Sequence, residues 1–185
     1  RTIHDGTLIS LLGDNDSVIR ERAIRAYGSI QDTTVLNLLV IHLEDSDPRV
    51  QYVSAFAIGQ TATMLSKSGR LTLQHDLIWA RLDRMSAIPI DRLTSEIPRG
   101  RLVEEIGKFG TEEALTDLLT RFGNSSAGLH PSLIMSIARF AIRGITSTQA
   151  IEYVLQHVKP ADNALWQAVY ALQRIGNRKE LRHEI

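Results

Sequence analysis

The sequence repeats itself: residues 14–30 and residues 45–61 carry the same pattern. The first segment reads DNDSVIRERAIRAYGSI and the second reads DSDPRVQYVSAFAIGQT, and Asp16 aligns with Asp47, 31 positions further on. One unit of this length is too small to bury its own hydrophobic face, so such units stack on their neighbours to form a continuous core. The repeat therefore predicts a solenoid of stacked units.

Each copy predicts a helix with one buried face. Asp16 and Asp47 can accept hydrogen bonds from the free N–H groups of a first helical turn, and Pro48 suits the first helical position because that N–H has no partner. Apolar residues follow at three- and four-residue steps, which places them on one helical face: Ile19, Ala23, Ala26, Tyr27 and Ile30. Gly28 and Gly59 remove a side chain near the helix end, either for close approach of a neighbouring backbone or for the helix exit.

A shorter helical segment precedes each copy, at residues 8–12 and 34–43, so the unit is helix, aspartate-rich turn, helix. This unit resembles the HEAT repeat, whose turn and second helix follow the pattern Asp-Pro-x-Val-Arg, then paired alanines with Ala-Leu-Gly or Ile-Gly. The matching residues are Asp16, Ile19, Arg20, Ala23, Ala26 and Gly28 in the first copy and Asp47, Pro48, Val50, Ala55, Ala57 and Gly59 in the second. Gln51 stands where the family prefers arginine, which puts an inter-repeat role of that arginine in doubt.

Later copies of the repeat are more degenerate. Residues 102–115, 136–151 and 172–181 repeat the join between one unit and the next, with Arg143 in the glycine position of the second segment. The resemblance implies an all-α fold, a right-handed α-α superhelix of about five helical hairpins, in a single HEAT-repeat domain over residues 1–185. The approximate repeats are 4–30, 33–60, 72–109, 111–144 and 147–175, with the start of a further repeat at 178–185.

Three irregular stretches lengthen individual units. They are residues 62–71, 87–97 and 123–131. Insertions of this kind fall on loops at the edges of a solenoid, so we expect loops there. We also expect the chain to be a segment excised from a longer protein.

Charge and composition argue against several function classes. Lysine and arginine number 21 and aspartate and glutamate also number 21, so the chain has no net field to attract a polyanion and we expect no nucleic-acid partner. The chain has no cysteine, which excludes thiolate metal sites and catalytic thiols. The longest apolar runs are far shorter than the ~20 residues of a membrane-spanning helix, so we expect no membrane insertion.

No arrangement of residues typical of an active site is recognisable. The six histidines never fall at the i, i+4 spacing with an adjacent glutamate that a zinc protease uses: His4, His42, His75, His130, His157 and His183. Glu104 and Glu105 are adjacent, so on a helix they point about 100° apart and cannot form a facing carboxylate pair. We therefore predict no catalytic residue, no cofactor, no metal and no enzymatic activity for this segment.

Aromatic residues are predicted on the concave side of the stack. Aligning the second helices of the repeats places on that face Tyr52, Phe56, Phe140, Trp166 and Tyr170. Exposed apolar patches usually mark an interface, so we predict that these residues bind a partner together with Arg22, Arg25 and Arg101. Two alternatives stay open: the later repeats have slipped register, or the inserted segment 88–97 folds over the rings. The arginines, with Arg139 and Arg143, either form a polar rim or pair with Glu21, Glu104 and Glu105.

The predicted function is non-catalytic binding or scaffolding of a protein, a peptide or another domain of the same chain. The segments ERAIRAYGSIQD, LVEEIGKFGTEEAL and SIARFAIRGI resemble the HEAT-repeat region of some bacterial proteins that also carry a cyclophilin-type peptidyl-prolyl isomerase domain. That resemblance implies that any isomerase activity lies outside this segment. Two alternatives are a HEAT-like lyase that attaches bilin pigments and a HEAT-like DNA glycosylase, the second of which the neutral charge disfavours.

Overall fold

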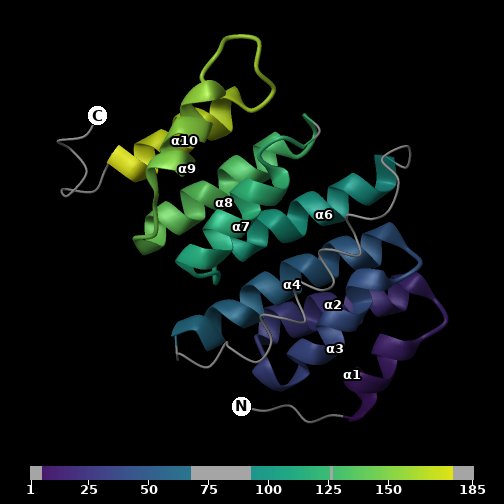
Figure 1. Ribbon diagram of the computed structural model, residues 1–185. Helices are drawn as coiled ribbons and strands as arrows, with labels where there is room; N and C mark the ends of the chain where they lie inside the picture. Colours follow the sequence, from purple (N-terminus) through teal and green to yellow (C-terminus); the bar gives the residue numbers. More distant parts are fainter. Residues whose placement is uncertain (1–5, 68–92, 126, 177–185) are drawn as a thin grey trace. The chain divides into compact units, whose positions relative to one another are not determined.

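The structure, a computed structural model, describes residues 6–67, 93–125 and 127–176. Within these ranges the chain forms α-helices and short 3₁₀-helices joined by turns, and it contains no strand (Figure 1). Contacts divide the chain into two compact units, residues 1–102 and 103–185, which we describe separately. The predicted first helix of the third repeat, the predicted repeat start at 178–185, and His4, His75 and His183 lie outside the described residues.

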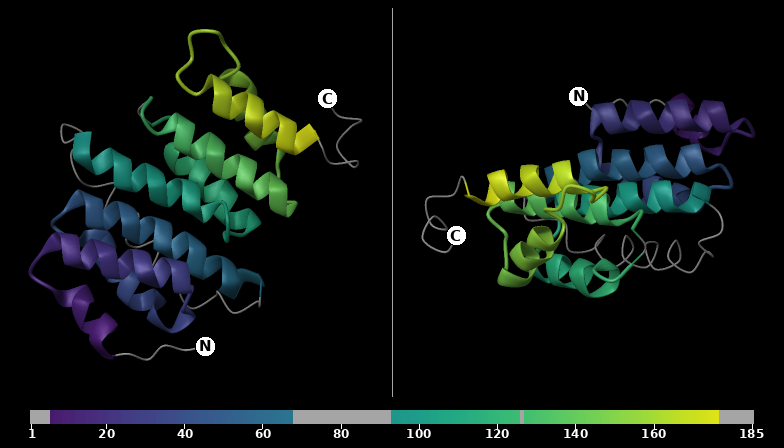
Figure 2. Two further views of the ribbon diagram at one scale, coloured as in Figure 1. Left: turned by 180° about the vertical axis from the view of Figure 1, so that it is seen from behind. Right: turned by 90° about the horizontal axis from the view of Figure 1, so that it is seen from above.

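The first unit is built from helix pairs joined by tight turns. Its elements are α1 (Gly6–Ser10), η1 (Leu11–Gly13), α2 (Ser17–Ile30), η2 (Thr33–Val35), α3 (Leu36–Ile41), η3 (His42–Glu44) and α4 (Pro48–Lys67). Helices α2 and α4, the second helices of the two copies, lie side by side, and α3 packs against α4 (Figure 2). The predicted helix–turn–helix unit is therefore confirmed in both copies.

The 31-residue repeat also appears in the hydrogen bonds of the two turns. The N–H of Val18 donates to Asp16 Oδ1 (2.8 Å), and in the second copy the N–H of Arg49 donates to Asp47 Oδ1 (2.9 Å). Helix α4 begins at Pro48, as the sequence predicts. Each aspartate thus satisfies one of the N–H groups that a first helical turn leaves without a partner.

Gly28 serves the close approach of two helices rather than a helix exit. A Cβ at this position would lie 3.0 Å from Ala57 Cβ and 3.2 Å from Ala57 Cα. Helix α2 continues past Gly28 to Ile30 and is capped by Gln31, whose φ of 57° is left-handed. The small residues at 28 and 57 therefore let the second helices of the two repeats pack closely.

Arg20 links the first repeat to the second. Its guanidinium donates to both carboxylate oxygens of Asp45, at 2.8 Å from Nε and 2.7 Å from Nη2, and also to the carbonyl of Asp14 (2.8 Å). Gln51 occupies the equivalent place 31 residues later and donates to the carbonyl of Asp45 (2.6 Å). The glutamine therefore keeps the bond within its own turn, but its single amide nitrogen cannot reproduce the two-pronged bond that a guanidinium makes to a carboxylate.

Four complete helices of the described chain lie in the second unit. Helix α6 (Leu93–Ile106) ends there, and α7 (Glu112–Phe122), α8 (His130–Arg143), α9 (Thr148–Gln156) and α10 (Leu165–Gly176) follow. Helices α8 and α10 lie side by side, while α7 packs against α8 and α9 against α10 (Figure 2). Thr111 and Ser147 accept hydrogen bonds from the first turns of α7 and α9. These hairpins repeat the arrangement of the first unit.

Helix α8 is fixed to the end of α6 by close packing and by buried charge. A Cβ on Gly107 would lie 2.9 Å from Ser136 Cα, so only glycine fits there without displacing α8. Glu105 is fully buried and pairs with Lys108 and with Arg139, whose Nη1 lies 3.2 Å from Glu105 Oε1. Arg139 also bonds Glu104. The alternative that these arginines pair with glutamates is thus correct for Arg139.

Two of the predicted loops are partly helical. Helix α4 runs to Lys67, through the first six residues of the stretch 62–71, and α6 starts at Leu93, inside the stretch 87–97. The third stretch, 123–131, is non-helical at its described residues up to 129, and its last two residues belong to α8, which begins at His130. Residues 68–92 lie outside the described residues.

Candidate functional site

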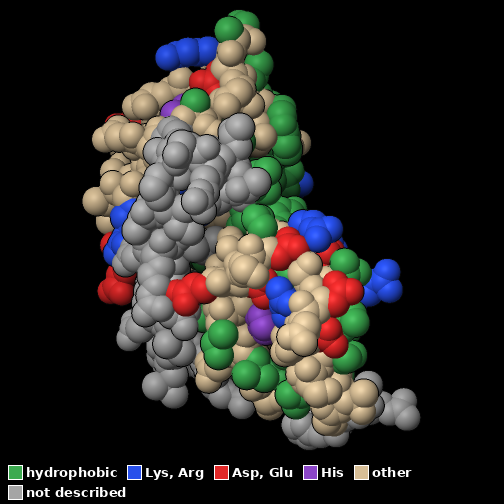
Figure 3. Space-filling view, turned by 90° about the vertical axis from the view of Figure 1, so that its right-hand side faces the viewer, with side chains coloured by type: hydrophobic (Ala, Val, Ile, Leu, Met, Phe, Trp, Pro, Cys, Tyr) green, Lys and Arg blue, Asp and Glu red, His purple; other side chains and the backbone are tan. Residues whose placement is uncertain are grey.

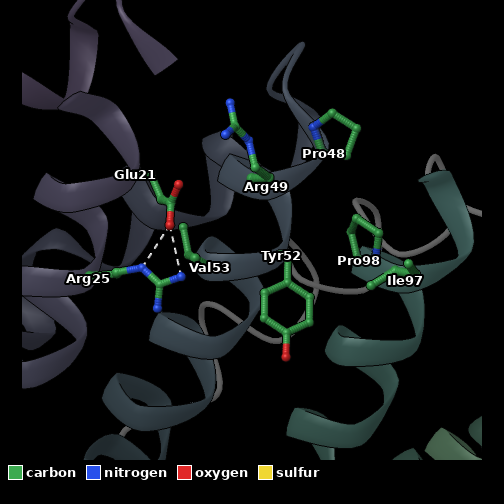
Figure 4. Close-up of a pocket in the computed structure, with 8 residues that line it drawn as sticks. All are labelled: Glu21, Arg25, Pro48, Arg49, Tyr52, Val53, Ile97 and Pro98. Carbon is green, nitrogen blue, oxygen red and sulfur yellow. Dashed lines mark hydrogen bonds and ion pairs between the residues drawn. The ribbon is translucent and has the colours of Figure 1, made fainter. Parts of the chain in front are cut away.

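A groove in the first unit is the main candidate site. It has a volume of about 420 Å³ and lies between α2, the first turns of α4 and the described N-terminal part of α6 (Figure 4). Eight residues line it: Glu21, Arg25, Pro48, Arg49, Tyr52, Val53, Ile97 and Pro98. All of them belong to residues 1–102, so the groove lies within one compact unit.

Helical spacing brings these side chains together. Arg49, Tyr52 and Val53 project from one side of α4 because they are three and four residues apart, and Glu21 and Arg25 are four apart on α2. Val53 is buried and forms the floor, whereas Tyr52 is half-buried and Ile97 is 64% exposed. The groove thus has a packed base and an apolar wall open to solvent.

Arginines surround the aromatic part of the groove. Arg25 donates to Glu21 Oε1 from Nε (2.9 Å) and Nη2 (2.8 Å), which Figure 4 shows as dashed lines. Arg49 bonds Asp47, with Nη2 2.8 Å from Oδ2. Hydrogen bonds from the side chain of Arg49 first, and then from Ser17, hold the pKa of the Asp47 carboxyl far below its usual range.

Arg101 lies over the aromatic rings that border the groove. Its guanidinium carbon is 4.8 Å from the centroid of the Phe56 ring and 5.6 Å from that of Tyr52. Both distances fall within the range of cation–π attraction. Four predicted site residues, Arg25, Tyr52, Phe56 and Arg101, are therefore gathered in the first unit, and Arg22 is exposed on α2 without lining the groove.

The prediction that Phe140 lies on an exposed aromatic row is wrong. Phe140 is fully buried in the second unit, and a Cβ on Gly110 would lie 2.8 Å from its ring. Its neighbours Ile137 and Ala141 are also buried, so the apolar face of α8 is wider than the alignment with α4 implies. Phe140 belongs to the core of the second unit.

Trp166 and Tyr170 lie on α10, in the second unit. Trp166 is 63% exposed, and Val169 beside it is 53% exposed. Tyr170 is half-buried, with the guanidinium carbon of Arg174 4.6 Å from its ring centroid. The exposed or half-buried aromatic residues of the prediction are therefore divided between the two units, with Tyr52 and Phe56 in the first and Trp166 and Tyr170 in the second.

Six groove residues were absent from the predicted site: Pro48, Arg49, Glu21, Val53, Ile97 and Pro98. The first two carry a usable signal, since they lie three to five residues before Tyr52 and Val53 on the same helix. The last two carry none, because they reach the groove from a helix that begins 26 residues after α4 ends and the pattern suggested a loop there. Long-range packing of this kind has no local signature.

A second cluster of titratable side chains closes the turn between α9 and α10. The rings of His130 and His157 lie 4.6 Å apart between centroids, and His157 Nδ1 is 2.9 Å from Asp162 Oδ2. Asp162 also accepts from the N–H of Ala164 (2.8 Å). Burial, with a smaller contribution from the Asp162 charge, raises the pKa of Tyr153 to about 12, so the phenol keeps its proton. These contacts hold the turn in place.

The carboxylates at the groove are already held by arginines. Glu21 pairs with Arg25 and Asp47 with Arg49, so neither is placed as a base near an open cavity. Across the part of the chain that the structure describes, no group of three His, Cys, Asp or Glu side chains is arranged to hold a metal ion. No helix among the described residues is long and apolar enough to cross a membrane.

Comparisons with known proteins agree with the repeat architecture. Residues 6–67 match the family model described as HEAT repeats. The crystal structure of an engineered protein is similar to this chain with a TM-score of 0.56 and 18% sequence identity, covering 92% of this chain and 78% of that one. No curated protein matches. At that identity the likeness shows the fold alone, and the chain is an all-α, HEAT-like solenoid whose residues 6–67 match HEAT repeats.

Proposed function

We propose that this chain is a non-catalytic protein-binding domain and that the α2–α4–α6 groove holds a segment of its partner. HEAT repeats generally mediate protein interaction or scaffolding. The observation that carries the proposal for this chain is the groove itself: an open cavity of about 420 Å³ with half-buried Tyr52 and exposed Ile97 in its lining. Apolar side chains left open to water in a concave surface are typical of an interaction site.

Cation–π contacts support a preformed site. The guanidinium of Arg101 over Phe56 and Tyr52 restrains the rings, and the Glu21–Arg25 pair restrains one wall. A site that is ordered before binding loses less conformational entropy when the partner docks. The groove is therefore better suited to capture a segment than the exposed Trp166 and Val169, which lie on the surface of a single helix.

The other functions considered lack a supporting contact in the described residues. The resemblance to the HEAT-repeat region of cyclophilin-type isomerase proteins, which would make this an accessory domain, stays a prediction, as do pigment attachment and base excision. Figure 3 shows positive and negative side chains intermixed with hydrophobic ones on one described face. A mixed surface of that kind suits a protein partner better than a nucleic acid, which favours a continuous positive stripe.

Capture experiments with the full chain test the proposal. Bait carrying Tyr52→Ser and Ile97→Ser is compared with wild-type bait in lysate of the source cells, with circular dichroism as the check on folding. Both side chains are partly or largely exposed, so we expect the fold to persist. Partners of the wild type should be lost from the groove variant because the apolar wall has been removed.

A matched control replaces the other exposed apolar set. The Trp166→Ser, Val169→Ser variant changes an aromatic and an aliphatic residue on α10 in the second unit. It should retain the partners that the groove variant loses. Loss of partners in this control, with retention in the groove variant, would move the binding site to the second unit and overturn the proposal.

A further inference from the structure

The charges around the groove are unevenly exposed. The side chains of Arg25 and Arg49 are 57% and 66% exposed, whereas those of their partners Glu21 and Asp47 are 20% and 19% exposed. A molecule approaching the groove therefore meets guanidinium groups before it meets carboxylates. Arg22 is exposed on α2 as well, one turn before Arg25.

The arginines retain the capacity to bind another acceptor. A guanidinium has five N–H donors, and the described bonds from Arg25 to Glu21 use Nε and Nη2. Those from Arg49 to Asp47 likewise use Nε and Nη2. The Asp47 oxygens are both already engaged by Arg49, so this carboxylate offers little to a cation. A new carboxylate can be bound without breaking either existing pair.

Arg25 and Arg49 lie on α2 and α4, on one side of the groove (Figure 4). Tyr52 is flanked by Arg49 on its own helix, and Ile97 and Pro98 form the opposite side of the groove (Figure 4). Val53 closes the base. This arrangement accepts a large apolar side chain at the centre and acidic groups at one edge.

We infer that the groove binds an acidic protein segment that carries one large apolar side chain, which enters between Tyr52 and Ile97 while neighbouring carboxylates bind Arg25 and Arg49. The inference rests on the proposed function, which it makes more specific. Charge complementarity selects the partner here: a basic segment would place its cations against the exposed guanidinium groups.

A phage-displayed library of random peptides, selected on the full-length chain and counter-selected on the Tyr52→Ser, Ile97→Ser variant, tests this directly. Enriched peptides should contain Asp or Glu close to one Leu, Ile, Met, Phe or Trp. The tightest peptide, labelled with fluorescein, is then compared by fluorescence anisotropy with versions in which Gln or Lys replaces every acidic residue.

The variant Arg25→Gln, Arg49→Gln should weaken binding of the acidic peptide about tenfold, since two exposed charge pairs are lost. Raising the salt concentration should weaken it too. The control Arg121→Gln, an exposed arginine on α7 in the second unit, should leave the affinity unchanged.

Each outcome is decisive. Enrichment of neutral or basic peptides that still depend on Tyr52 overturns the acidic specificity and leaves the groove as the binding site. Equal affinity of the acidic peptide and of its Lys-substituted version also overturns this inference, as does a selection that enriches no peptide. The proposed function is then judged by the capture experiment alone. If an acidic peptide binds the Tyr52→Ser, Ile97→Ser variant as tightly as the wild type, the groove is not its binding site.

Discussion

At the scale of single residues, the join between the first two repeats depends on Arg20. Its side chain and that of Asp45 are 13% and 6% exposed, so the pair is far better shielded from water than Arg49 and Asp47. Shielded pairs with two-pronged geometry are stronger than exposed ones, whose contribution is often close to zero. The two arginines therefore make a matched comparison within one unit.

Arg20→Ala should lower the free energy of unfolding by about 2 kcal/mol, because Asp45 loses its charged hydrogen bonds while staying buried. Arg49→Ala should cost less than about 1 kcal/mol, because that pair is exposed. Urea unfolding followed by circular dichroism measures both. Equal effects of the two substitutions would contradict the assigned role of Arg20.

The same carboxylate makes stability depend on pH. Burial raises the pKa of Asp45, but the bonds from Arg20, the Asp47 N–H and His42 outweigh it, and the net pKa lies below the ordinary 3.8. The stabilisation is therefore complete above about pH 4 and is lost as the pH falls through the lower, folded-state pKa. In the Asp45→Asn variant, the free energy of unfolding should fall less steeply below about pH 4. Urea unfolding at successive pH values measures this dependence. The same loss of stability at low pH in the variant and the wild type would contradict this role of Asp45.

The capping aspartates were predictable from the sequence, and the fate of Phe140 was not. Capping by Asp16 and Asp47 needs only the residues of one turn, so the local pattern is sufficient. Burial of Phe140 depends on the space left by Gly110, thirty positions earlier in the chain. No local pattern encodes that contact.

At the scale of helices, the buried face of α8 is wide enough to include Phe140, whereas Trp166 on α10 is exposed. Phe140→Ala should lower the free energy of unfolding by about 3–5 kcal/mol, because it leaves a cavity in a fully buried site. Trp166→Ala, at a 63% exposed position, should cost less than about 1 kcal/mol. Thermal or urea unfolding compares them. A small loss of unfolding free energy for Phe140→Ala would contradict the burial of this side chain.

Helix-to-helix distance is set by small residues. Gly107→Ala should lower the free energy of unfolding by about 1–3 kcal/mol, because the new Cβ meets the backbone of Ser136 in α8. Gly13→Ala is the control, since nothing lies within 4 Å of a Cβ there. Differential scanning calorimetry should show a marked drop in Tm for the first variant only; similar Tm values for both would mean that α8 moves freely.

The helices of the first unit were predictable and part of the groove was not. Helical spacing from Asp47 onward places Tyr52 and Phe56 near each other, and Arg101 was included from the alignment of second helices. Ile97 and Pro98 complete the groove from α6, which the irregular pattern of residues 87–97 concealed. Pro98 lies inside α6, although proline is unfavourable in a helix interior.

At the scale of the whole molecule, the repeat determines the class of fold, whereas local surface side chains determine which partner is bound. The 31-residue period predicts a stack of units, because each unit must pack on its neighbours to bury its apolar face, and the resemblance of the unit to a HEAT repeat implies the all-α class. Which of its surfaces binds depends on side chains that differ between copies, such as Tyr52 in the second copy, which aligns with Glu21 in the first. The single domain over 1–185 and its repeat boundaries stay predictions.

The claim that a partner segment binds in the α2–α4–α6 groove is tested most directly by NMR. The full chain, labelled with ¹⁵N, is titrated with the tightest peptide from the selection, and changes in backbone amide shifts are mapped along the sequence. The largest changes should fall on groove residues: Arg25, Arg49, Tyr52, Val53 and Ile97. Changes centred on Trp166 and Val169, or no changes at all, would contradict the account.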